Sequence, residues 1–440
     1  KLLNQEDLKG ANKSMNFMAD FVMIPMQFII FFFTVYYFVI AFFGVWRRAE
    51  EKILKPEKSF AVIVAAHNEE QVIGPLVDNL KMLNYPNSLY DIFVIADNCT
   101  DNTATIAQKN GALVFERTNH EQKGKGFAME WMFSKLFKLE KKYDAVAIFD
   151  ADNLVHPNFL LEMNSKLCKG DKVIQGYLDA KNPHDTWVSG TFAIAFWVTN
   201  HIWHLAKSNI GLSSVLGGTG MCISTDILEE FGWGATCLTE DMEFTMKVLA
   251  KGVRTTWAHD AIVYDEKPLT FMQSWRQRKR WAQGHFDIAQ RYIPKMIKEG
   301  IKQKDIRIID AVIHLLQPHF LLISTAFVIA SYIQIQVPPF YTNIYSLLPS
   351  QILSIIMIGQ YLLPVIILMR IRAQWQTWAY LILYPVFIYS WIPITFMGFL
   401  HRNRKAWSHT QHTRSISYEE FVMKNTDFNK EAFAEKQIIK

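Results

Sequence analysis

Cysteine is scarce in this chain of 440 residues, which has four. They are Cys99, Cys168, Cys222 and Cys237. No two of them form a Cys-x-x-Cys pair, so the sequence lacks both a zinc signature and a disulfide framework. All four lie outside the apolar runs, and we expect reduced thiols in a cytosolic domain. The net charge is also small, +5 at neutral pH. This excludes the general affinity for nucleic acid of a strongly basic chain.

Repeats and low-complexity tracts are absent, and no cleavable signal peptide is expected because the first apolar run is too long for one. What the chain has instead is apolar sequence, since 50% of its residues are hydrophobic. This fraction is high for a soluble enzyme and low for a chain lying entirely in a membrane. It predicts one soluble domain combined with several membrane spans.

The apolar runs divide the chain into segments. After a stub at 1–14, residues 15–46 predict a transmembrane helix, and Arg47, Arg48 and Lys52 place its end on the cytoplasmic side. Residues 268–317 mix basic, aromatic and apolar side chains, as amphipathic interface helices do. Residues 318–400 contain three apolar runs, at 318–336, 347–371 and 376–400, and 401–440 form a tail. The last run contains Pro385 and Pro393. It either spans the membrane or re-enters it, and the side of the tail depends on which.

Residues 53–267 have the pattern of a soluble α/β domain. Short apolar runs at 60–66, 90–96, 112–116 and 145–149 alternate with helix patterns, which predicts a parallel sheet covered by helices on both faces. Ligands of such sheets bind where the strands end at their carboxyl side. We therefore expect the functional residues in the segments that follow these strands.

Two carboxylates follow the strand at 145–149. Asp150 and Asp152 are two residues apart, so in extended chain they point the same way. Such a pair can hold Mg²⁺ or Mn²⁺ together with substrate phosphates, although an isolated Asp-x-Asp is more often a solvated turn. The loops after the first two strands carry His67, Glu69 and Asp97, which either line a nucleoside pocket or cap the next helices. Asn68 is the expected cap of the first of these helices.

Three further motifs carry charge. Lys125 lies in Lys-Gly-Lys-Gly before a helix, where lysine can face phosphate. Thr239-Glu240-Asp241 opens a helix, either as an N-cap with acids that complement the helix dipole or as the site of a general base. Gln277, Arg280 and Trp281 share one helical face. This basic stretch either meets lipid headgroups or binds a diphosphate and a sugar.

The order of these motifs between membrane spans resembles the processive family 2 glycosyltransferases, a group that includes cellulose, chitin, hyaluronan and mixed-linkage β-glucan synthases. The resemblance implies an α/β GT-A (Rossmann-like) cytosolic catalytic domain inserted between transmembrane helices with amphipathic interface helices. It also implies an inverting transfer from a UDP-sugar and secretion of the product through a channel formed by 318–400. The implied location is the plasma membrane, as a multi-pass protein with a cytoplasmic catalytic domain.

The resemblance also implies residue roles. Ala65, His67, Glu69 and Asp97 would line the UDP pocket; Lys125 and Asp150 would contact the donor; Asp152, with Asp150, would hold Mg²⁺ or Mn²⁺; Asp241, beside Glu240, would be the base; Gln277, Arg280 and Trp281 would bind the diphosphate and acceptor; and Gly218, Thr219 and Gly220 would cradle the acceptor. The implied partners are the UDP-sugar, the growing polysaccharide and the bilayer, with no nucleic acid.

This glycine loop, Gly217-Gly-Thr-Gly-Met221, departs from the forms typical of bacterial cellulose synthases and of hyaluronan synthases. The expected donor is UDP-glucose, and the expected product is a β-glucan such as cellulose or mixed-linkage 1,3/1,4-glucan. The alternatives are a non-processive enzyme that adds one sugar to a lipid carrier, and a chitin- or hyaluronan-type synthase that uses UDP-GlcNAc. Residues 407–412 also resemble a gating segment of related synthases.

Overall fold

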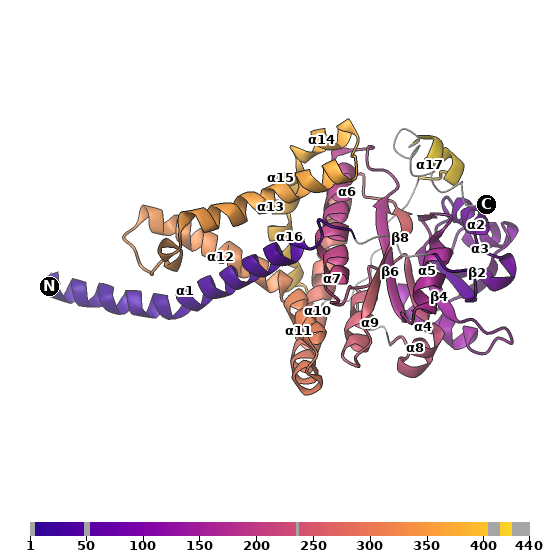
Figure 1. Cartoon of the computed structure of the whole chain (residues 1–440), viewed down its shortest axis with the longest axis horizontal. Helices are drawn as coiled ribbons and strands as arrows, with labels where there is room; N and C mark the ends of the chain where they lie inside the picture. The colour runs from indigo at the N-terminus through magenta and orange to yellow at the C-terminus, as the bar shows by residue number, and fades with distance from the viewer. Residues whose placement is uncertain (1–4, 48–52, 235–236, 404–413, 425–440) are drawn as a thin grey trace.

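The computed structural model describes residues 5–47, 53–234, 237–403 and 414–424, without the side chains of 5–16. A body built around a β-sheet lies at one end, and long helices project from it (Figure 1). The segment at 407–412 with its expected gating role lies outside the described residues.

The first half of the body confirms the predicted alternation of strands and helices. In chain order the elements are β1 (Phe60–Ala66), α2 (Ile73–Lys81), the 3-10 helix η1 (Asn87–Leu89), β2 (Tyr90–Asp97), α3 (Thr103–Lys109), β3 (Leu113–Arg117), α4 (Lys125–Leu136) and β4 (Ala145–Asp150). Strands β3, β2, β1 and β4 pair in parallel in that order. Apolar clusters pack on both faces of the sheet, as expected for strands that helices cover on two sides.

The second half of the sheet is mixed, and this corrects the expectation of a parallel sheet. It comprises β5 (Leu154–Val155), α5 (Phe159–Cys168), β6 (Val173–Ala180), β7 (Met221–Ser224), α8 (Thr225–Phe231), α9 (Glu240–Leu249) and β8 (Thr255–Asp265). Strand β7 runs antiparallel to both β4 and β6, and β5 runs antiparallel to β8. The order of the eight strands is β3-β2-β1-β4-β7-β6-β8-β5. Because β7 enters from the opposite direction, the glycine loop before it meets the end of β4.

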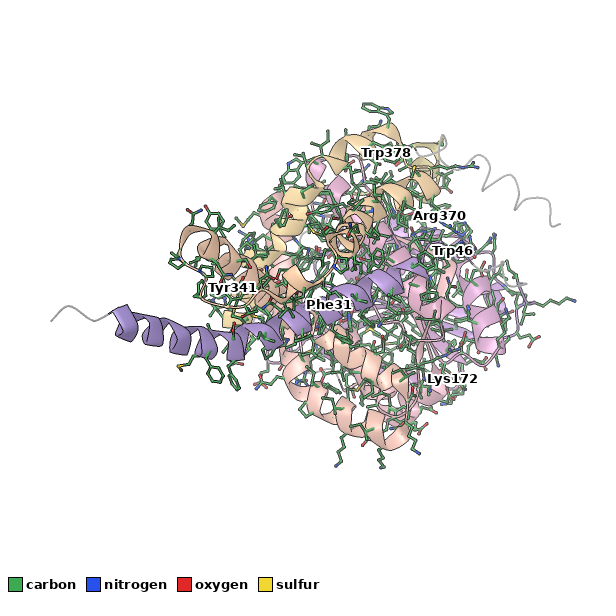
Figure 2. All side chains as sticks on the ribbon, turned by 60° about the vertical axis from the view of Figure 1, so that its left-hand side comes forward. Phe31, Trp46, Lys172, Tyr341, Arg370 and Trp378 are labelled. Atoms are coloured by element: carbon green, nitrogen blue, oxygen red, sulfur yellow. The ribbon has the colours of Figure 1, made fainter. Side chains whose placement is uncertain are left out.

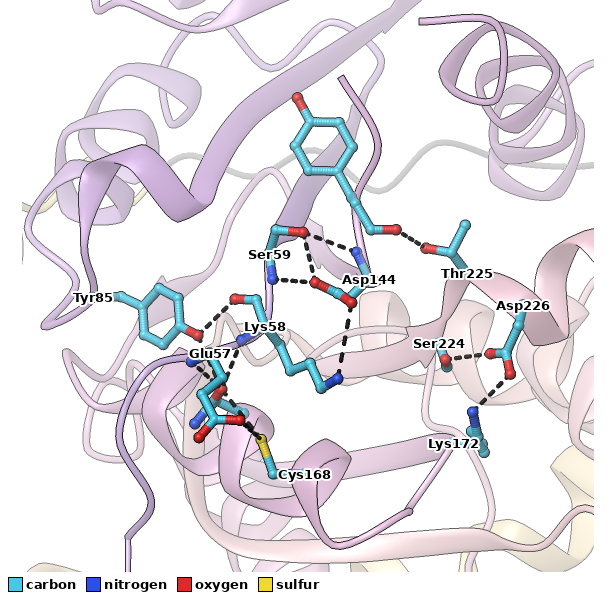
Figure 3. A network of polar contacts seen from close by, with 12 residues as sticks. Glu57, Lys58, Ser59, Tyr85, Asp144, Cys168, Lys172, Ser224, Thr225 and Asp226 are labelled. Carbon is cyan, nitrogen blue, oxygen red and sulfur yellow. Dashed lines mark hydrogen bonds and ion pairs between the residues drawn. The ribbon is translucent and has the colours of Figure 1, made fainter. Parts of the chain in front are cut away.

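A polar network ties the sheet together at the end opposite the strands' carboxyl ends (Figure 3). The Asp144 carboxylate accepts hydrogen bonds from the Ser59 backbone N–H at 2.7 Å and from the Ser59 hydroxyl at 2.8 Å. The Thr225 hydroxyl donates to the Tyr143 carbonyl at 2.7 Å. These bonds fix where β1, β4 and α8 begin, which in turn sets the positions of the strand ends that carry the predicted site residues.

Two long helical segments connect the sheet to the apolar helices. One runs through α6 (Trp187–Thr199), the π-helix η2 (Asn200–Leu205) and α7 (Ala206–Asn209). The other comprises α10 (Phe271–Gln303) and α11 (Ile306–Leu315), within the range predicted for interface helices. Thr186 and Thr270 begin α6 and α10 with reciprocal side-chain and backbone hydrogen bonds, the capping box that fixes a helix start.

Among the described residues, three helices are long and apolar enough to cross a membrane, within α1 (Gln5–Phe42), α12 (Gln317–Gln336) and α13 (Ser350–Arg370). The 3-10 helix η3 (Ile344–Leu347) lies between the last two. The third predicted run is broken into α14 (Trp375–Leu381), α15 (Tyr384–Tyr389) and α16 (Trp391–Leu400), with a bend of 52° after α14. This geometry is that of a broken span or a re-entrant loop.

Both flanks of this broken segment lie near the body that contains the sheet. Arg370, just before it, donates to the Val45 carbonyl where α1 meets the body, and Trp46 and Arg370 lie close together in Figure 2. After it, the tail helix α17 (Tyr418–Lys424) packs on β8, with the Phe421 and Tyr264 ring centroids 4.5 Å apart. In Figure 1, α17 lies against the sheet-containing body. Both flanks of the broken segment thus contact the body that contains the sheet.

Helix α10 crosses the start of α9 at Gly284, where an added Cβ would lie 2.4 Å from the Thr239 hydroxyl oxygen. Overpacking of this kind costs about 1–3 kcal/mol. Alanine regains about 1 kcal/mol of helix propensity, so we expect Gly284→Ala to lower the free energy of unfolding by up to about 2 kcal/mol, whereas the same exchange without a clash would raise it. Gln290→Ala, at an exposed position of the same helix, is the control. Denaturant titration followed by tryptophan fluorescence measures both, and equal losses would contradict this packing.

Candidate functional site

One cavity of about 1610 Å³ gathers the predicted site residues where the strands end. Its wall includes Ala65, His67, Glu69, Asp97, Lys125, Asp150, Asp152, Gly218, Thr219, Glu240, Asp241, Gln277, Arg280 and Trp281. Gly220 is the exception. Its carbonyl accepts a hydrogen bond from the Gly176 N–H at 2.8 Å, and an added Cβ would lie 2.9 Å from the Val263 side chain. The sequence prediction for Gly220 is therefore wrong in place, because this residue joins β6 and β7 behind the cavity.

Two asparagines in left-handed conformation shape one end of the cavity. Asn68 has φ 55° and Asn98 has φ 51°, values that asparagine tolerates better than most residues. The Asn68 side-chain oxygen accepts from the Thr100 N–H at 2.8 Å, and that of Asn98 accepts from the Asn119 N–H at 2.8 Å. The loops after β1, β2 and β3 are thereby fixed to one another. The expected helix cap at Asn68 is wrong, because α2 begins only at Ile73.

A buried ion pair lies behind this end of the cavity. Asp97 and Arg117 are joined at 2.6 Å, with side chains 8% and 4% exposed. Arg117 also donates to the Gln122 carbonyl at 2.9 Å and so anchors the loop that leads to Lys125. Arg117 was missed in the sequence. The signal was that it ends β3 as Asp97 ends β2, since the two are register partners on neighbouring parallel strands.

Four charged side chains from three elements meet at the centre of the cavity. The Lys125 ammonium forms an ion pair with Asp150 and donates to the Gly218 carbonyl at 2.7 Å. Burial opposes the charge of Lys125, but Asp150 and Glu240 outweigh burial and raise its pKa. Burial also raises the pKa of Glu240, and Lys125 counteracts that rise.

Asp241 is the carboxylate whose ionisation changes most. Burial, with the neighbouring charge of Glu240, raises the pKa of Asp241 to about 7. One of its oxygens accepts from the Met242 N–H at 2.8 Å, while a Cβ on Gly218 would lie 3.3 Å from the other oxygen. The glycine at 218, with φ 85°, therefore leaves room beside the carboxylate. A carboxylate with a pKa near neutrality in a cavity is a candidate general base.

A network around Lys181 positions Asp152. The Lys181 ammonium donates to the Asp152 carbonyl at 2.7 Å and forms an ion pair with Glu266 at 3.3 Å. The Glu266 N–H donates to the Asp152 carboxylate at 3.3 Å. Lys181 also donates to the Arg414 carbonyl at 3.2 Å, so the C-terminal segment contacts the loop that carries Asp152.

The carboxylates suit a divalent cation that is completed by substrate. Within the described ranges, no group of three or more His, Cys, Asp or Glu residues forms a complete metal site. Asp150 and Asp152 offer oxygen ligands from one strand end, and both line the cavity. Mg²⁺ is held in this way by one or two carboxylates plus substrate phosphates. The residues present therefore fit a cation that arrives with a diphosphate.

Helix α10 contributes polar groups on one face. The Gln277 side-chain oxygen and the Arg280 Nε are buried, and in the described structure neither has a hydrogen-bond partner. Buried polar atoms are normally paired, so two unpaired ones in a cavity wall indicate a polar ligand. Trp281 completes this face and lies edge-on to Phe192 with the ring centroids 5.9 Å apart.

Arg278, which follows Gln277 in α10, does not line the cavity. It is fully buried, and its guanidinium donates to the Phe387 carbonyl at 3.2 Å and to the Ser390 hydroxyl at 2.8 Å. It also stacks on the Phe387 ring at 4.2 Å. Arg278 thus satisfies backbone at the junction of α15 and α16, where a broken apolar helix needs partners. The headgroup-binding interpretation of this basic stretch is therefore wrong for Arg278.

Beyond Trp281 the cavity continues among the apolar helices. Its wall there includes Tyr37, Phe192, Phe196, Phe320, Met357, Tyr361, Leu381, Tyr384, Phe387, Ile388, Tyr389 and Trp391. One cavity therefore joins the charged cluster to the apolar helices.

The sheet, the acidic strand end and the cavity define a nucleotide-sugar glycosyltransferase. The family model described as "Glycosyltransferase like family 2" matches residues 56–284, and the chain belongs to this family. The matched residues run from just before β1 into α10, so they include every predicted site residue.

Relatives match the same part of the chain. A probable glycosyltransferase of Bacillus subtilis is 26% identical over 275 residues, which are 59% of this chain and 62% of that protein. A β-monoglucosyldiacylglycerol synthase of Nostoc is 30% identical over 248 residues, 53% of this chain and 49% of that protein. Mouse hyaluronan synthase 3 is 23% identical over 172 residues, 37% of this chain and 31% of that protein. The chain thus spans less than two thirds of the length of these relatives.

Among solved structures, a mannosyltransferase from Pyrobaculum calidifontis in complex with GDP-Man and Mn²⁺ is similar over 86% of this chain and 97% of its own. The TM-score is 0.56 at 16% sequence identity. At this identity the likeness supports the GT-A fold, and it extends beyond the part of the chain that the family model covers.

The Lys181 network predicts a stability difference. Removing one partner of a buried ion pair costs about 3–5 kcal/mol, and we expect this loss for Lys181→Met because Glu266 stays buried. Lys172→Met is the matched control. Its partner Asp226 lies 2.7 Å away, but their side chains are 46% and 56% exposed (Figure 3), so the loss should stay below about 1 kcal/mol. Denaturant titration measures both; comparable losses would refute the role of Lys181.

Proposed function

We propose that this enzyme transfers a hexose from UDP-glucose, with inversion, onto a hydroxyl of an acceptor that reaches the cavity from the membrane. The observation that carries this proposal is the single cavity in which Asp241 lies between the strand ends and the apolar helices. The Nostoc relative, named a glucosyl-lipid synthase, supports glucose as the first donor to test. The tail and the end of α1 both contact the catalytic domain, which supports a multi-pass protein of the plasma membrane with this domain in the cytoplasm.

In this mechanism the UDP portion binds at the loops that follow β1 and β2. His67 and Glu69 belong to the loop after β1 and line the cavity. Asp150 and Asp152 would hold Mg²⁺ or Mn²⁺, which when bound would neutralise charge on the diphosphate. The Arg280 guanidinium stabilises the same charge as UDP leaves. Gln277 and Trp281 orient the acceptor.

Asp241 performs the proton transfer. Its carboxylate takes the proton of the acceptor hydroxyl while that oxygen bonds to the anomeric carbon. The bond from the anomeric carbon to phosphate breaks, and its electron pair leaves with UDP. Lys125 holds Asp150 and the Gly218 carbonyl in place, which fixes the wall beside Asp241.

Two activities differ in their acceptor: a single transfer to a lipid, and processive synthesis of a polymer. Only 6% of the apolar window of α12 is buried inside the protein, and 22% in each of α1 and α13, so these helices present their sides outward. This openness favours one transfer to a lipid acceptor over secretion through a closed channel. Processive synthesis of a β-glucan is the second candidate, and the aromatic wall at Trp281 favours it because sugars stack on such rings.

Product size separates the candidates. Purified protein is supplied with each UDP-hexose and with lipid, and the products are resolved by mass. A lipid carrying one hexose is the expected product, and a polymer that linkage-specific hydrolases digest would establish the processive candidate instead. Release of UDP without any glycosylated product would exclude both.

The ionisation of Asp241 predicts the pH dependence. A base must be ionised, so kcat/KM should be retained above the pKa of about 7 and lost as the pH falls below it. Glu240→Gln removes the neighbouring charge that raises this pKa, and the acidic limb should move to lower pH. Asp241→Asn should lower kcat by roughly 10²–10⁴ with little change in UDP binding. An acidic limb unmoved in Glu240→Gln would show that another group titrates.

The metal prediction concerns Asp152. Chelation of divalent cations should abolish transfer, and Mn²⁺ should restore it. Asp152→Asn should weaken Mn²⁺-dependent binding of UDP by about tenfold or more in calorimetry. Asp226→Asn, in α8 at the opposite end of the strands, is the control and should leave binding unchanged. Full UDP affinity without a cation would disprove the metal assignment.

A further inference from the structure

The far end of the cavity has a wall that is also part of the outer surface. Met357 and Tyr361 of α13 and Ile388 and Tyr389 of α15 line the cavity. These four side chains are 59%, 65%, 40% and 57% exposed, respectively. A residue that both lines a cavity and faces outward marks its mouth, so the cavity opens between α13 and α15.

The mouth lies in the apolar belt. Helix α13 is long and apolar enough to cross a membrane, and α15 belongs to the bent apolar segment. Tyr361 is at the twelfth position of the twenty-one in α13, well away from Arg370 at its end. An opening at this depth faces lipid hydrocarbon rather than water.

A hydrogen bond crosses the mouth. The Tyr361 and Tyr389 hydroxyls lie 3.2 Å apart, joining α13 to α15. Among lipid chains a phenol has no water to bond, so the two hydroxyls satisfy each other. On its other side α13 is held against α1, where a Cβ at Gly359 would lie 2.5 Å from the Phe38 ring. Helix α13 can therefore separate from α15 more readily than from α1.

The side chains that line this part of the cavity determine which kind of ligand can enter it. The cavity-lining residues contributed by α1 and by α12 to α16 include no Asp, Glu, Lys or Arg within the described residues. The charged groups of the cavity come from the catalytic domain and α10. An apolar chain is favoured in this part, and a charged headgroup would be without a counter-charge along the path.

We propose that the gap between α13 and α15 is a lateral portal, closed by the Tyr361–Tyr389 hydrogen bond, through which an uncharged, hydroxyl-bearing membrane lipid enters as the acceptor. Its hydroxyl reaches Asp241 past Phe192 and Trp281, while its aliphatic chains remain across the mouth. This inference rests on the proposed glycosyl transfer and adds the acceptor class and its entry path.

The test narrows the mouth without touching the catalytic residues. Met357→Trp and Ile388→Trp each place bulk in the portal. Ile358→Trp and Val386→Trp are matched controls, because these neighbours are 58% and 53% exposed but do not line the cavity. The full chain is placed in phosphatidylcholine nanodiscs with UDP-glucose. The acceptors are dioleoylglycerol, water-soluble dihexanoylglycerol, a polyprenyl phosphate and a soluble β-glucan oligosaccharide.

The portal variants should lower kcat/KM for dioleoylglycerol by about tenfold, the scale of a steric change in an apolar pocket. Transfer to dihexanoylglycerol and both controls should be unchanged. Equal losses for long and short acceptors, or equal effects of the controls, would overturn the portal. Preference for polyprenyl phosphate or for the oligosaccharide would overturn the acceptor class. If the wild type turned over no UDP-hexose with any acceptor, the proposed function itself would fail, and the portal with it.

A second measurement does not depend on turnover. A diacylglycerol with a photoreactive diazirine close to the glycerol end of its acyl chain, the part nearest the hydroxyl, is irradiated in the same nanodiscs, and labelled residues are located by mass spectrometry. Phe192, 2% exposed and on a helix outside the apolar spans, should be labelled, and Ile388→Trp should prevent this. Labelling confined to the outer faces of α12 and α13 would overturn the entry path.

Discussion

This structure depends on one constraint: side chains of opposite charge must meet at the centre of one cavity. Asp150, Glu240 and Asp241 would repel one another at the centre of the cavity, and the Lys125 ammonium offsets this repulsion. Because these groups come from β4, from the start of α9 and from the start of α4, the sheet and its helices must meet at this point. The glycine at 218 belongs to the same requirement, since its carbonyl is the other partner of Lys125 and it leaves the space beside Asp241 empty.

Helix α10 connects the charged cluster to the apolar helices. One of its faces presents Gln277, Arg280 and Trp281 to the cavity, and the adjacent face presents Arg278 to the junction of α15 and α16. Any displacement of the broken helix would therefore act on the helix that also closes the cavity. The close approach of Gly284 to Thr239 fixes the same helix to the residue that precedes the acid pair.

Local pattern sufficed for strands that are mostly apolar, but not for β6, which is nearly as buried and includes Gln175, Gly176 and Asp179. The apolar runs of β1, β2 and β4 are fully surrounded, so composition alone located them to within a residue. It failed for β7, which has four residues, and for β8, which includes His259 and Asp260 and is only partly buried. Of the site residues that the motif order predicted, all except Gly220 line the cavity. Arg117, Lys181 and Arg278 escaped because each acts through a partner 20 or more residues away. The contact of Phe421 with Tyr264 was likewise not readable from the sequence, because the two residues lie far apart in the chain.

Charged side chains line one part of the cavity and apolar side chains line the other. This division explains why glycosyl transfer is proposed at the boundary between the two parts. A nucleotide diphosphate is stabilised among Lys125, Arg280 and a cation, but has no counter-charge beyond Trp281. An apolar chain is stable among Phe387, Tyr384 and Leu381, but not among ionised groups. Donor and acceptor can therefore meet only at the boundary, which is where Asp241 lies. Burial at this boundary, together with the charge of Glu240, raises the pKa of this carboxylate toward neutrality, where it can both take and release a proton.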